Sequence, residues 1–117
     1  MPKEFLAQLS DSSRDQVKII HITGELDEIN VETLKQVVDP LLDDDAVKTL
    51  ILDLKRLEFI NSKGIGYLVS IHTHLSKDAR MLCLAAANEA VMDVISLVGL
   101  PTIVPYYETL EEAMAKA

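Results

Sequence analysis

The chain has 117 residues, a length that suits one compact domain and leaves little room for two. Hydrophobic residues make up 49% of it, so it can bury a core rather than stay disordered. Nineteen acidic residues against eleven dispersed basic ones give a formal net charge of −8, which disfavours nucleic acids and anionic membranes as partners because both repel an anion.

The N-terminal stretch MPKEFLAQLSDSS does not resemble a secretory signal, because charged residues stand where an apolar stretch is required. Residues 5–9 (FLAQL) are expected to form a short strand, and residues 17–23 (VKIIHIT), rich in β-branched side chains, a second one. A short loop joins the two, which predicts an antiparallel pair within a mixed sheet. No apolar run approaches the ~20 residues of a membrane span. We therefore expect a soluble, cytoplasmic protein without membrane insertion.

Residues 24–30 (GELDEIN) are predicted to form a loop that ends in Asn30 as a helix N-cap. Apolar residues then recur at helical spacing, at Val31, Leu34, Val38, Leu41 and Leu42. Pro40 removes one hydrogen bond and clashes with the preceding turn, so we expect a kink or an early end near Val38. After a turn at DDDA (43–46), residues 48–54 (KTLILDL) form a nearly continuous apolar run. Such a run is typical of a central strand covered on both faces.

The segment FINSKGIG (59–66) follows, and it places Ser62 where a strand gives way to a helix. The buried stripe of that helix is predicted at Ile65, Leu68, Val69, His72 and Leu75. Residues 80–86 (RMLCLAA) are the next expected strand. The only cysteine, Cys83, lies within it; it excludes an internal disulfide and is expected to be an inert core thiol.

The last third of the chain carries three capping signals. Asn88 is expected to cap a helix that buries Val91, Val94, Ile95 and Val98, and Gly99 to end it in a left-handed conformation. Residues 101–107 (PTIVPYY) offer a short last strand. Thr109 is expected to cap a last helix over residues 110–117. Alternating strands and helices predict an α/β sandwich.

Ser62 admits several chemical interpretations. A nucleophile elbow has glycine two positions before its serine, but Ile60 stands there. The candidate bases are badly placed as well, since His21 lies in a strand and His72 about three turns, or roughly 15 Å, along the helix. A plain helix cap is a common role for serine at such a joint, and a modification site fits it too.

The two glycines after Ser62 and the two histidines of the same helix are weak signals. Gly64 and Gly66 begin a dinucleotide fingerprint whose third glycine would fall at Val69. Each glycine costs a helix up to ~1 kcal/mol relative to alanine, which indicates a close approach to the backbone or tight packing on a strand. His72 and His74 point in different directions and lack paired carboxylates, so we expect no metal and no cofactor.

Three segments together resemble the STAS domain, specifically the bacterial anti-sigma factor antagonists (anti-anti-sigma factors). LILDLKRLEFINSKGIGYLVSIHTHL (50–75) is similar to the family's apolar strand, Asp-Ser-Ser-Gly-Leu-Gly turn and helix. ITGELDEINVETLK (22–35) is similar to its Gly-Glu-Leu-Asp turn and the helix after it, and VMDVISLVGL (91–100) to its third helix. The resemblance extends from Val17 to Ala113.

The resemblance implies a single STAS domain over residues 1–117. Its α/β fold would have a mixed central β-sheet of four to five strands and about four helices packed mainly on one face. It also implies a function without enzymatic activity: the protein binds an anti-sigma factor of the serine kinase type and so releases a sigma factor for transcription. The kinase phosphorylates the family's serine after the aspartate, a position that matches Ser62, and a phosphatase reverses the step.

The chain departs from the family at two positions beside Ser62. Asn61 replaces the usual aspartate and loses its charge, and Lys63 places a cation at a helix N-terminus, against the macrodipole. The alternative is therefore a STAS accessory subunit of a lipid-transport complex or a signalling scaffold, in which Ser62 only caps its helix and carries no phosphate.

Phosphorylation of Ser62 would add about −1.5 to −2 charges at neutral pH. We expect the phosphate to lie over free amides at the start of the helix, whereas a partner covering Ser62 would have to bury an unpaired dianion. From the resemblance, the partner-binding face is expected to comprise Glu25, Asp27, Asn30, Asn61, Ser62, Lys63 and Gly64.

Overall fold

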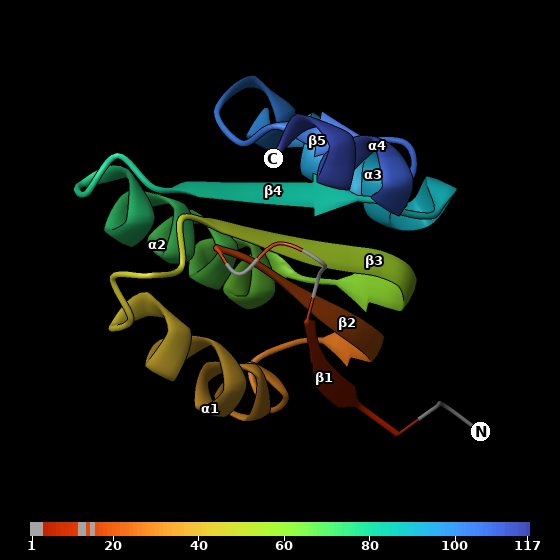
Figure 1. Cartoon of the computed structure of the whole chain (residues 1–117). Helices are drawn as coiled ribbons and strands as arrows, with labels where there is room; N and C mark the ends of the chain where they lie inside the picture. Colours follow the sequence, from red (N-terminus) through yellow and green to blue (C-terminus); the bar gives the residue numbers. More distant parts are fainter. Residues whose placement is uncertain (1–3, 12–13, 15) are drawn as a thin grey trace.

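The computed structural model describes residues 4–11, 14 and 16–117 of the chain, and its strands form one five-stranded sheet in the order β1-β2-β3-β4-β5 (Figure 1). The strands are β1 (Leu6–Asp11), β2 (Val17–Leu26), β3 (Thr49–Ile60), β4 (Met81–Ala85) and β5 (Tyr106–Tyr107). Residues 1–3, 12, 13 and 15 lie outside the described residues, and all of these except residue 15 belong to the stretch considered above as a secretory signal.

The sheet is mixed, as predicted. β1 pairs with β2 in antiparallel fashion, while the β2–β3, β3–β4 and β4–β5 pairs are parallel. β3 occupies the middle of the sheet, and its first four residues, Thr49–Leu52, are all buried. The apolar run over residues 48–54 is therefore confirmed as a central strand covered on both faces.

The helices are α1 (Val31–Leu42), α2 (Ser62–Ser76), α3 (Glu89–Leu97) and α4 (Leu110–Lys116). The larger core lies between one face of the sheet and the first three helices, which contribute Leu34, Leu68 and Ile95 to it. On the other face, Ala113 of α4 packs in a smaller cluster with Ile51. Figure 1 shows α1 and α2 side by side and α4 beside β5. The expected fold, with helices mainly on one face, is confirmed.

The strands β2 and β3, which both end close to Ser62, are longer than predicted. β2 continues to Leu26 instead of ending at residue 23, and β3 continues to Ile60 instead of ending at residue 54. The pairing of the two strands contains register shifts after His21 and after Gly24. These irregularities expose neighbouring residues of β3 and break the period-two alternation by which a strand is recognised in a sequence.

A further prediction, the early end of the first helix, was wrong. The first helix does not end near Val38 but runs to Leu42, because Pro40 falls in the last turn and the Asp43 amide still bonds to the Asp39 carbonyl. The short last strand expected within residues 101–107 is present: β5 covers only Tyr106–Tyr107, and a 3₁₀ turn occupies Leu100–Thr102 before it.

The end signals of the later helices are confirmed. Asn88 accepts a hydrogen bond from the Val91 amide, Thr109 accepts one from the Glu112 amide, and Gly99 has a φ of 75°. Val98, however, is exposed rather than buried, because the left-handed turn follows directly after it.

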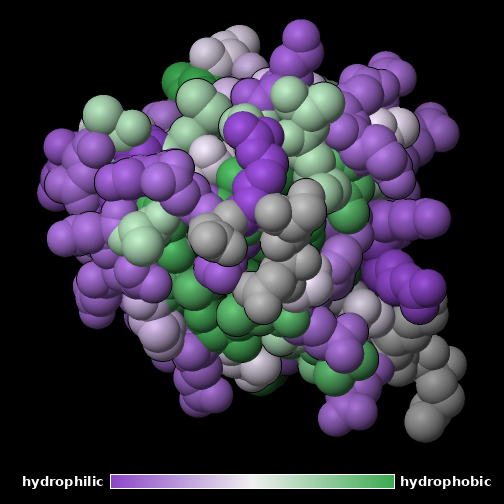
Figure 2. All heavy atoms as spheres, viewed as in Figure 1, coloured by the Kyte–Doolittle hydropathy of each residue, from purple (hydrophilic) through white to green (hydrophobic). Residues whose placement is uncertain are grey.

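Hydrophilic residues cover most of the face shown in Figure 2, and hydrophobic ones gather at its centre. No helix within the described residues is long and apolar enough to cross a membrane.

Candidate functional site

Asn61, not Ser62, caps α2. The Asn61 Oδ1 accepts hydrogen bonds from the backbone amides of Lys63 and Gly64, both at 3.1 Å. Asn61 has the extended backbone typical of an N-cap, and Ser62 is the first helical residue. The interpretation of Ser62 as a plain cap is therefore wrong. Its exposed side chain has no structural partner among the described residues.

The amide group of Asn61 also joins the two segments expected to form the partner-binding face. Its Nδ2 donates to Glu28 Oε2 over 2.7 Å, and its backbone amide donates to the Leu26 carbonyl. Asparagine can make both side-chain contacts because it carries an acceptor and a donor. An aspartate here would keep the cap but oppose the Glu28 carboxylate, which gives a physical reason for Asn61.

The turn between β2 and α1 is organised by Asp27. Its Oδ1 accepts hydrogen bonds from the amides of Ile29 and Asn30, at 3.1 and 2.9 Å. Asn30 begins the helix but makes no side-chain cap; its Nδ2 instead donates to the Glu25 carbonyl over 2.7 Å. The predicted N-cap position of Asn30 is therefore confirmed, but its side chain supplies no capping bond and contacts the Glu25 carbonyl instead.

The two glycines of α2 have opposite surroundings. A Cβ on Gly64 would lie 2.7 Å from the Leu26 carbonyl oxygen and 2.8 Å from the Ile60 side chain. Gly64 thus lets the start of α2 pack directly on the ends of β2 and β3. A Cβ on Gly66 would meet nothing within 4 Å. Of the two explanations offered by the sequence, tight packing applies to Gly64, and the fold of this chain does not require Gly66.

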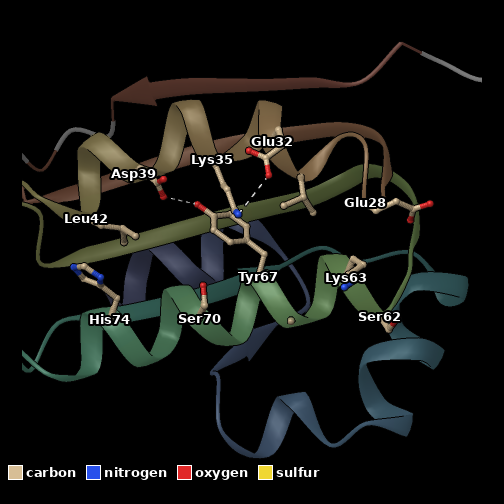
Figure 3. Close-up of a pocket in the computed structure, with 12 residues that line it drawn as sticks. Glu28, Glu32, Lys35, Asp39, Leu42, Ser62, Lys63, Tyr67, Ser70 and His74 are labelled. Carbon is tan, nitrogen blue, oxygen red and sulfur yellow. Dashed lines mark hydrogen bonds and ion pairs between the residues drawn. The ribbon is translucent and has the colours of Figure 1, made fainter.

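An open groove of about 960 Å³ separates α1 from α2 (Figure 3). Ser62 and Lys63 lie at one end of it together with Glu28, and His74 and Leu42 lie at the other end. Ser62 thus stands where the groove meets the start of α2 and the Asp27 turn.

Tyr67 forms the floor of the groove near its middle. Its hydroxyl donates to Asp39 Oδ1 over 2.9 Å, and Lys35 Nζ lies 5.5 Å from the centre of its ring. Lys35 also lies 3.5 Å from a Glu32 carboxylate oxygen. Burial and then the Asp39 hydrogen bond raise the pKa of Tyr67 well above its ordinary value, so the phenol stays protonated and ties α2 to α1.

The residues expected on the partner-binding face do lie together, but they differ in exposure. Ser62 and Lys63 are exposed, Gly64 is buried, and the others are half-buried, namely Glu25, Asp27, Asn30 and Asn61. The sequence reasoning missed three exposed neighbours: Glu28, Ile29 and Phe59. Ile29 is 76% exposed, and an isoleucine inside a polar loop was the signal available for it.

The start of α2 does not offer the vacant amides expected for a phosphate. The Lys63 and Gly64 amides are bonded to the Asn61 side chain, and the Ile65 amide to the Asn61 carbonyl. A phosphate on Ser62 would therefore add charge at an exposed position without filling vacant donors of these three residues.

The chemistry of other groups is limited by their surroundings. Cys83 is buried, and burial raises the pKa of its thiol from 9.0 to about 11, so the thiol is protonated and unreactive at neutral pH. Among the described residues, no group of three or more histidine, cysteine or acidic side chains is placed to hold a metal ion.

The chain matches a family model described as the STAS domain over residues 9–113. It is 23% identical over 100 residues to the anti-sigma F factor antagonist of Paenibacillus polymyxa, and the match covers 86% of both chains.

The fold is similar to the solved structures of two anti-sigma factor antagonists, one of which has been solved in two forms. An anti-sigma factor antagonist from Mycobacterium paratuberculosis is 26% identical, with a TM-score of 0.85 over 97% of this chain and 93% of the other. The unphosphorylated anti-sigma factor antagonist SpoIIAA is 27% identical, with a TM-score of 0.80 over 95% of both chains. The phosphorylated form of SpoIIAA, from Bacillus, gives a TM-score of 0.74 at 26% identity, over 95% of this chain and 98% of the other.

Proposed function

The chain belongs to the STAS domain family, and we propose that it is an anti-sigma factor antagonist whose binding is switched off by phosphorylation of Ser62. Residues 1–117 would act as one domain in the cytoplasm. The protein would act by occupying an anti-sigma factor, and the sigma factor would thereby be released.

The observation that carries this proposal is the position of Ser62. Its side chain is exposed. Asn61 caps the helix, so the Ser62 hydroxyl is not engaged in a capping hydrogen bond. A kinase can therefore reach the hydroxyl without disturbing the helix. Because SpoIIAA, a relative of similar fold, has been solved in a phosphorylated form, a covalent phosphate is compatible with this fold.

The electrostatics of the site account for a switch by charge. Ser62 shares its end of the groove with Glu28, whose carboxylate already accepts from Asn61. A phosphate would add a second anion there. Because three nearby helix amides are already bonded, Lys63 is the adjacent group that can pair with the phosphate. A partner that covers Ser62 would bury an incompletely paired dianion, at a cost of several kcal/mol by the general rule for buried charges.

The groove beside Ser62 supports a docking surface on α2. Gly66 lies one turn after Ser62, lines the same groove, and is not required by the packing of this chain. A glycine at an exposed helical position costs up to ~1 kcal/mol relative to alanine, and a partner backbone that approaches closely gives a reason for it.

The proposal names two partners. An anti-sigma factor of the serine kinase type would supply ATP, metal and base for the phosphorylation of Ser62, and a phosphatase would remove the phosphate. The net charge of −8 fits a basic docking surface on the anti-sigma factor, which would accelerate their encounter.

The second candidate is a STAS accessory subunit of a lipid-transport complex or signalling scaffold that is not phosphorylated. The hydrogen bond from Asn61 to Glu28 favours it, because that bond explains the missing aspartate without any kinase. It gives no role to Ser62, however, since the helix cap belongs to Asn61.

Phosphate mapping distinguishes the two candidates. The chain is incubated with the serine-kinase anti-sigma factor and Mg-ATP, digested, and analysed by mass spectrometry. We expect one phosphate, on Ser62, absent from Ser62→Ala and retained in Ser70→Ala, a matched control because Ser70 is exposed on the same groove. An unmodified Ser62, or a phosphate on Ser70 instead, would exclude the switch.

A further inference from the structure

The side of the groove formed by α1 and the turn before it carries a row of carboxylates. Glu28, Glu32 and Asp39 all line the groove, and they follow one another at intervals of four and seven residues. Such intervals bring side chains to one side of a helix. Among the residues that line the groove, these three carboxylates face two lysines, Lys35 of α1 and Lys63 of α2. The α1 side of the groove is therefore acidic except at Lys35.

Lys35 places a cation over the aromatic floor of the groove. Its Nζ lies 5.5 Å from the centre of the Tyr67 ring, close enough for a cation–π attraction, and 3.5 Å from Glu32 Oε1 (Figure 3). Next to the same ring, Asp39 Oδ1 accepts a hydrogen bond from the Tyr67 hydroxyl over 2.9 Å. The chain itself thus shows that a cation fits between the Tyr67 ring and the carboxylates of α1.

The contacts that hold Lys35 in this place are weak. Its side chain is 40% exposed and that of Glu32 is 72% exposed, and an ion pair at such exposure contributes little because water and salt screen it. Tyr67, in contrast, is only 8% exposed. A second cation can therefore reach the ring only when Lys35 moves away, and the long, exposed side chain of Lys35 can do so at little cost.

Asp39 can accept a further hydrogen bond from a ligand. Its Oδ1 accepts from Tyr67, whereas its Oδ2 has no hydrogen bond or ion pair with another described residue. An arginine guanidinium is planar, so it can donate to a carboxylate and stack on an aromatic ring at the same time. It is also less strongly hydrated than the ammonium group of a lysine. An arginine from outside therefore gains more from this place than Lys35 does.

We propose that the groove between α1 and α2 binds a basic segment of the anti-sigma factor, with one arginine over Tyr67 and beside Asp39, in place of Lys35. The choice of partner rests on the proposed function: the groove begins at Ser62, so a protein that covers Ser62 can extend along it. The three carboxylates of the groove complement the charge of such a segment. Lys35 is then an internal competitor of the partner's arginine.

Removal of the competitor tests this directly. Lys35→Ala should raise the affinity for the anti-sigma factor about five-fold in titration calorimetry, because the arginine no longer has to displace a resident cation. Lys116→Ala is the matched control: it removes the same charge from α4, on the other face of the sheet, and should leave the affinity nearly unchanged. An unchanged or lower affinity of Lys35→Ala, or an equal gain from Lys116→Ala, would overturn the inference.

The carboxylate is tested by a change that keeps its hydrogen bond. Asp39→Asn retains an oxygen that can accept the Tyr67 hydroxyl but loses the charge, so it should weaken binding of the anti-sigma factor about ten-fold. Glu111→Gln removes the same charge from α4 and should have little effect. Thermal unfolding checks that each variant is folded. If Asp39→Asn binds as tightly as the wild type, the groove does not hold an arginine.

A peptide titration separates this inference from the proposed function. If the wild type does not bind the anti-sigma factor, the proposed function fails, and the groove is tested with a synthetic peptide of leucine and arginine residues. NMR shifts of the isotope-labelled chain should then change along the groove, at residues 31–42 and 66–74, and a lysine version of the peptide should bind several-fold more weakly. Equal binding of the two peptides, or shifts outside the groove, would refute the arginine site.

The opposite failure has a different signature. If the wild type binds the anti-sigma factor but Lys35→Ala and Asp39→Asn bind equally well, the groove inference alone is wrong. The switch at Ser62 is then unaffected, because it depends on the exposure of that hydroxyl and not on the groove beyond it.

Discussion

Asn61 and Ser62 are adjacent in the chain but have different roles. The Asn61 side chain satisfies two amides of α2 and bonds to Glu28, while the Ser62 hydroxyl is exposed. A modification on Ser62 therefore leaves the helix cap intact. This separation lets charge change at the surface without a rearrangement of the fold.

Exchange of Asn61 for aspartate should destabilise the chain by about 1 kcal/mol at neutral pH, because the bond to Glu28 is lost and two carboxylates face one another. Adding Glu28→Gln should recover most of the loss, since an amide at position 28 can donate to the carboxylate introduced at position 61. Urea unfolding of the two single variants and the double variant measures this coupling. Equal stability of Asn61→Asp and the wild type would contradict the account.

Cys83 should make stability depend on alkaline pH. The thiol ionises near 9.0 when unfolded, but burial raises its pKa to about 11, so between these values the unfolded state binds fewer protons than the folded state. Stability should therefore fall as the pH rises through this window. Urea unfolding at several pH values should show the wild type losing more stability between pH 9 and 11 than Cys83→Ala. Tyr67, whose pKa is also raised, is present in both proteins, so the difference between them reports on Cys83. Parallel curves would show that the thiol is not shielded.

At the scale of elements, the start of α2 depends on one of its two glycines. Gly64→Ala would bring a methyl group to 2.7 Å from the Leu26 carbonyl oxygen, so the helix must move away from β2. We expect a loss of about 2 kcal/mol or more, in the range of overpacked cores. Thermal and urea unfolding measure it.

Gly66→Ala is the matched control, since a Cβ there has open space and alanine is the better helix former. It should raise stability by about 0.5–1 kcal/mol. Comparable destabilisation by both substitutions would contradict the packing described here.

The elements were predicted well wherever local signals agree with the tertiary structure. Asn88, Gly99 and Thr109 mark helix ends through contacts with their own neighbours, and such contacts can be read from a sequence. The far ends of β2 and β3 could not be read, because their irregular pairing depends on a partner strand more than twenty residues away.

The site was predicted in part for a similar reason. The sequence placed the Asp27 turn and the Ser62 joint together only through a family resemblance. The hydrogen bond from Asn61 to Glu28 joins residues 33 positions apart, and no local sequence pattern predicts it. Buried Arg80 is another such case: its guanidinium donates to the carbonyls of Leu42 and Val47, although arginine in a sequence usually indicates an exposed position.

At the scale of the whole molecule, the sheet brings the ends of β2 and β3 to one edge, where the turn before α1 and the start of α2 meet. The groove between the two helices opens from this edge (Figure 3). Phosphorylation would thus change the charge at one end of a surface formed by two helices, while the core beneath stays as it is.

The most direct test of this account is the affinity of the chain for its anti-sigma factor with and without a phosphate on Ser62, measured by titration calorimetry. Ser62→Ala should bind like the unmodified wild type, because the hydroxyl has no structural partner among the described residues. The phosphorylated chain should bind about a thousandfold more weakly, which corresponds to a cost of about 4 kcal/mol for burying the dianion. Equal affinity of the phosphorylated and unmodified chains would contradict the switch.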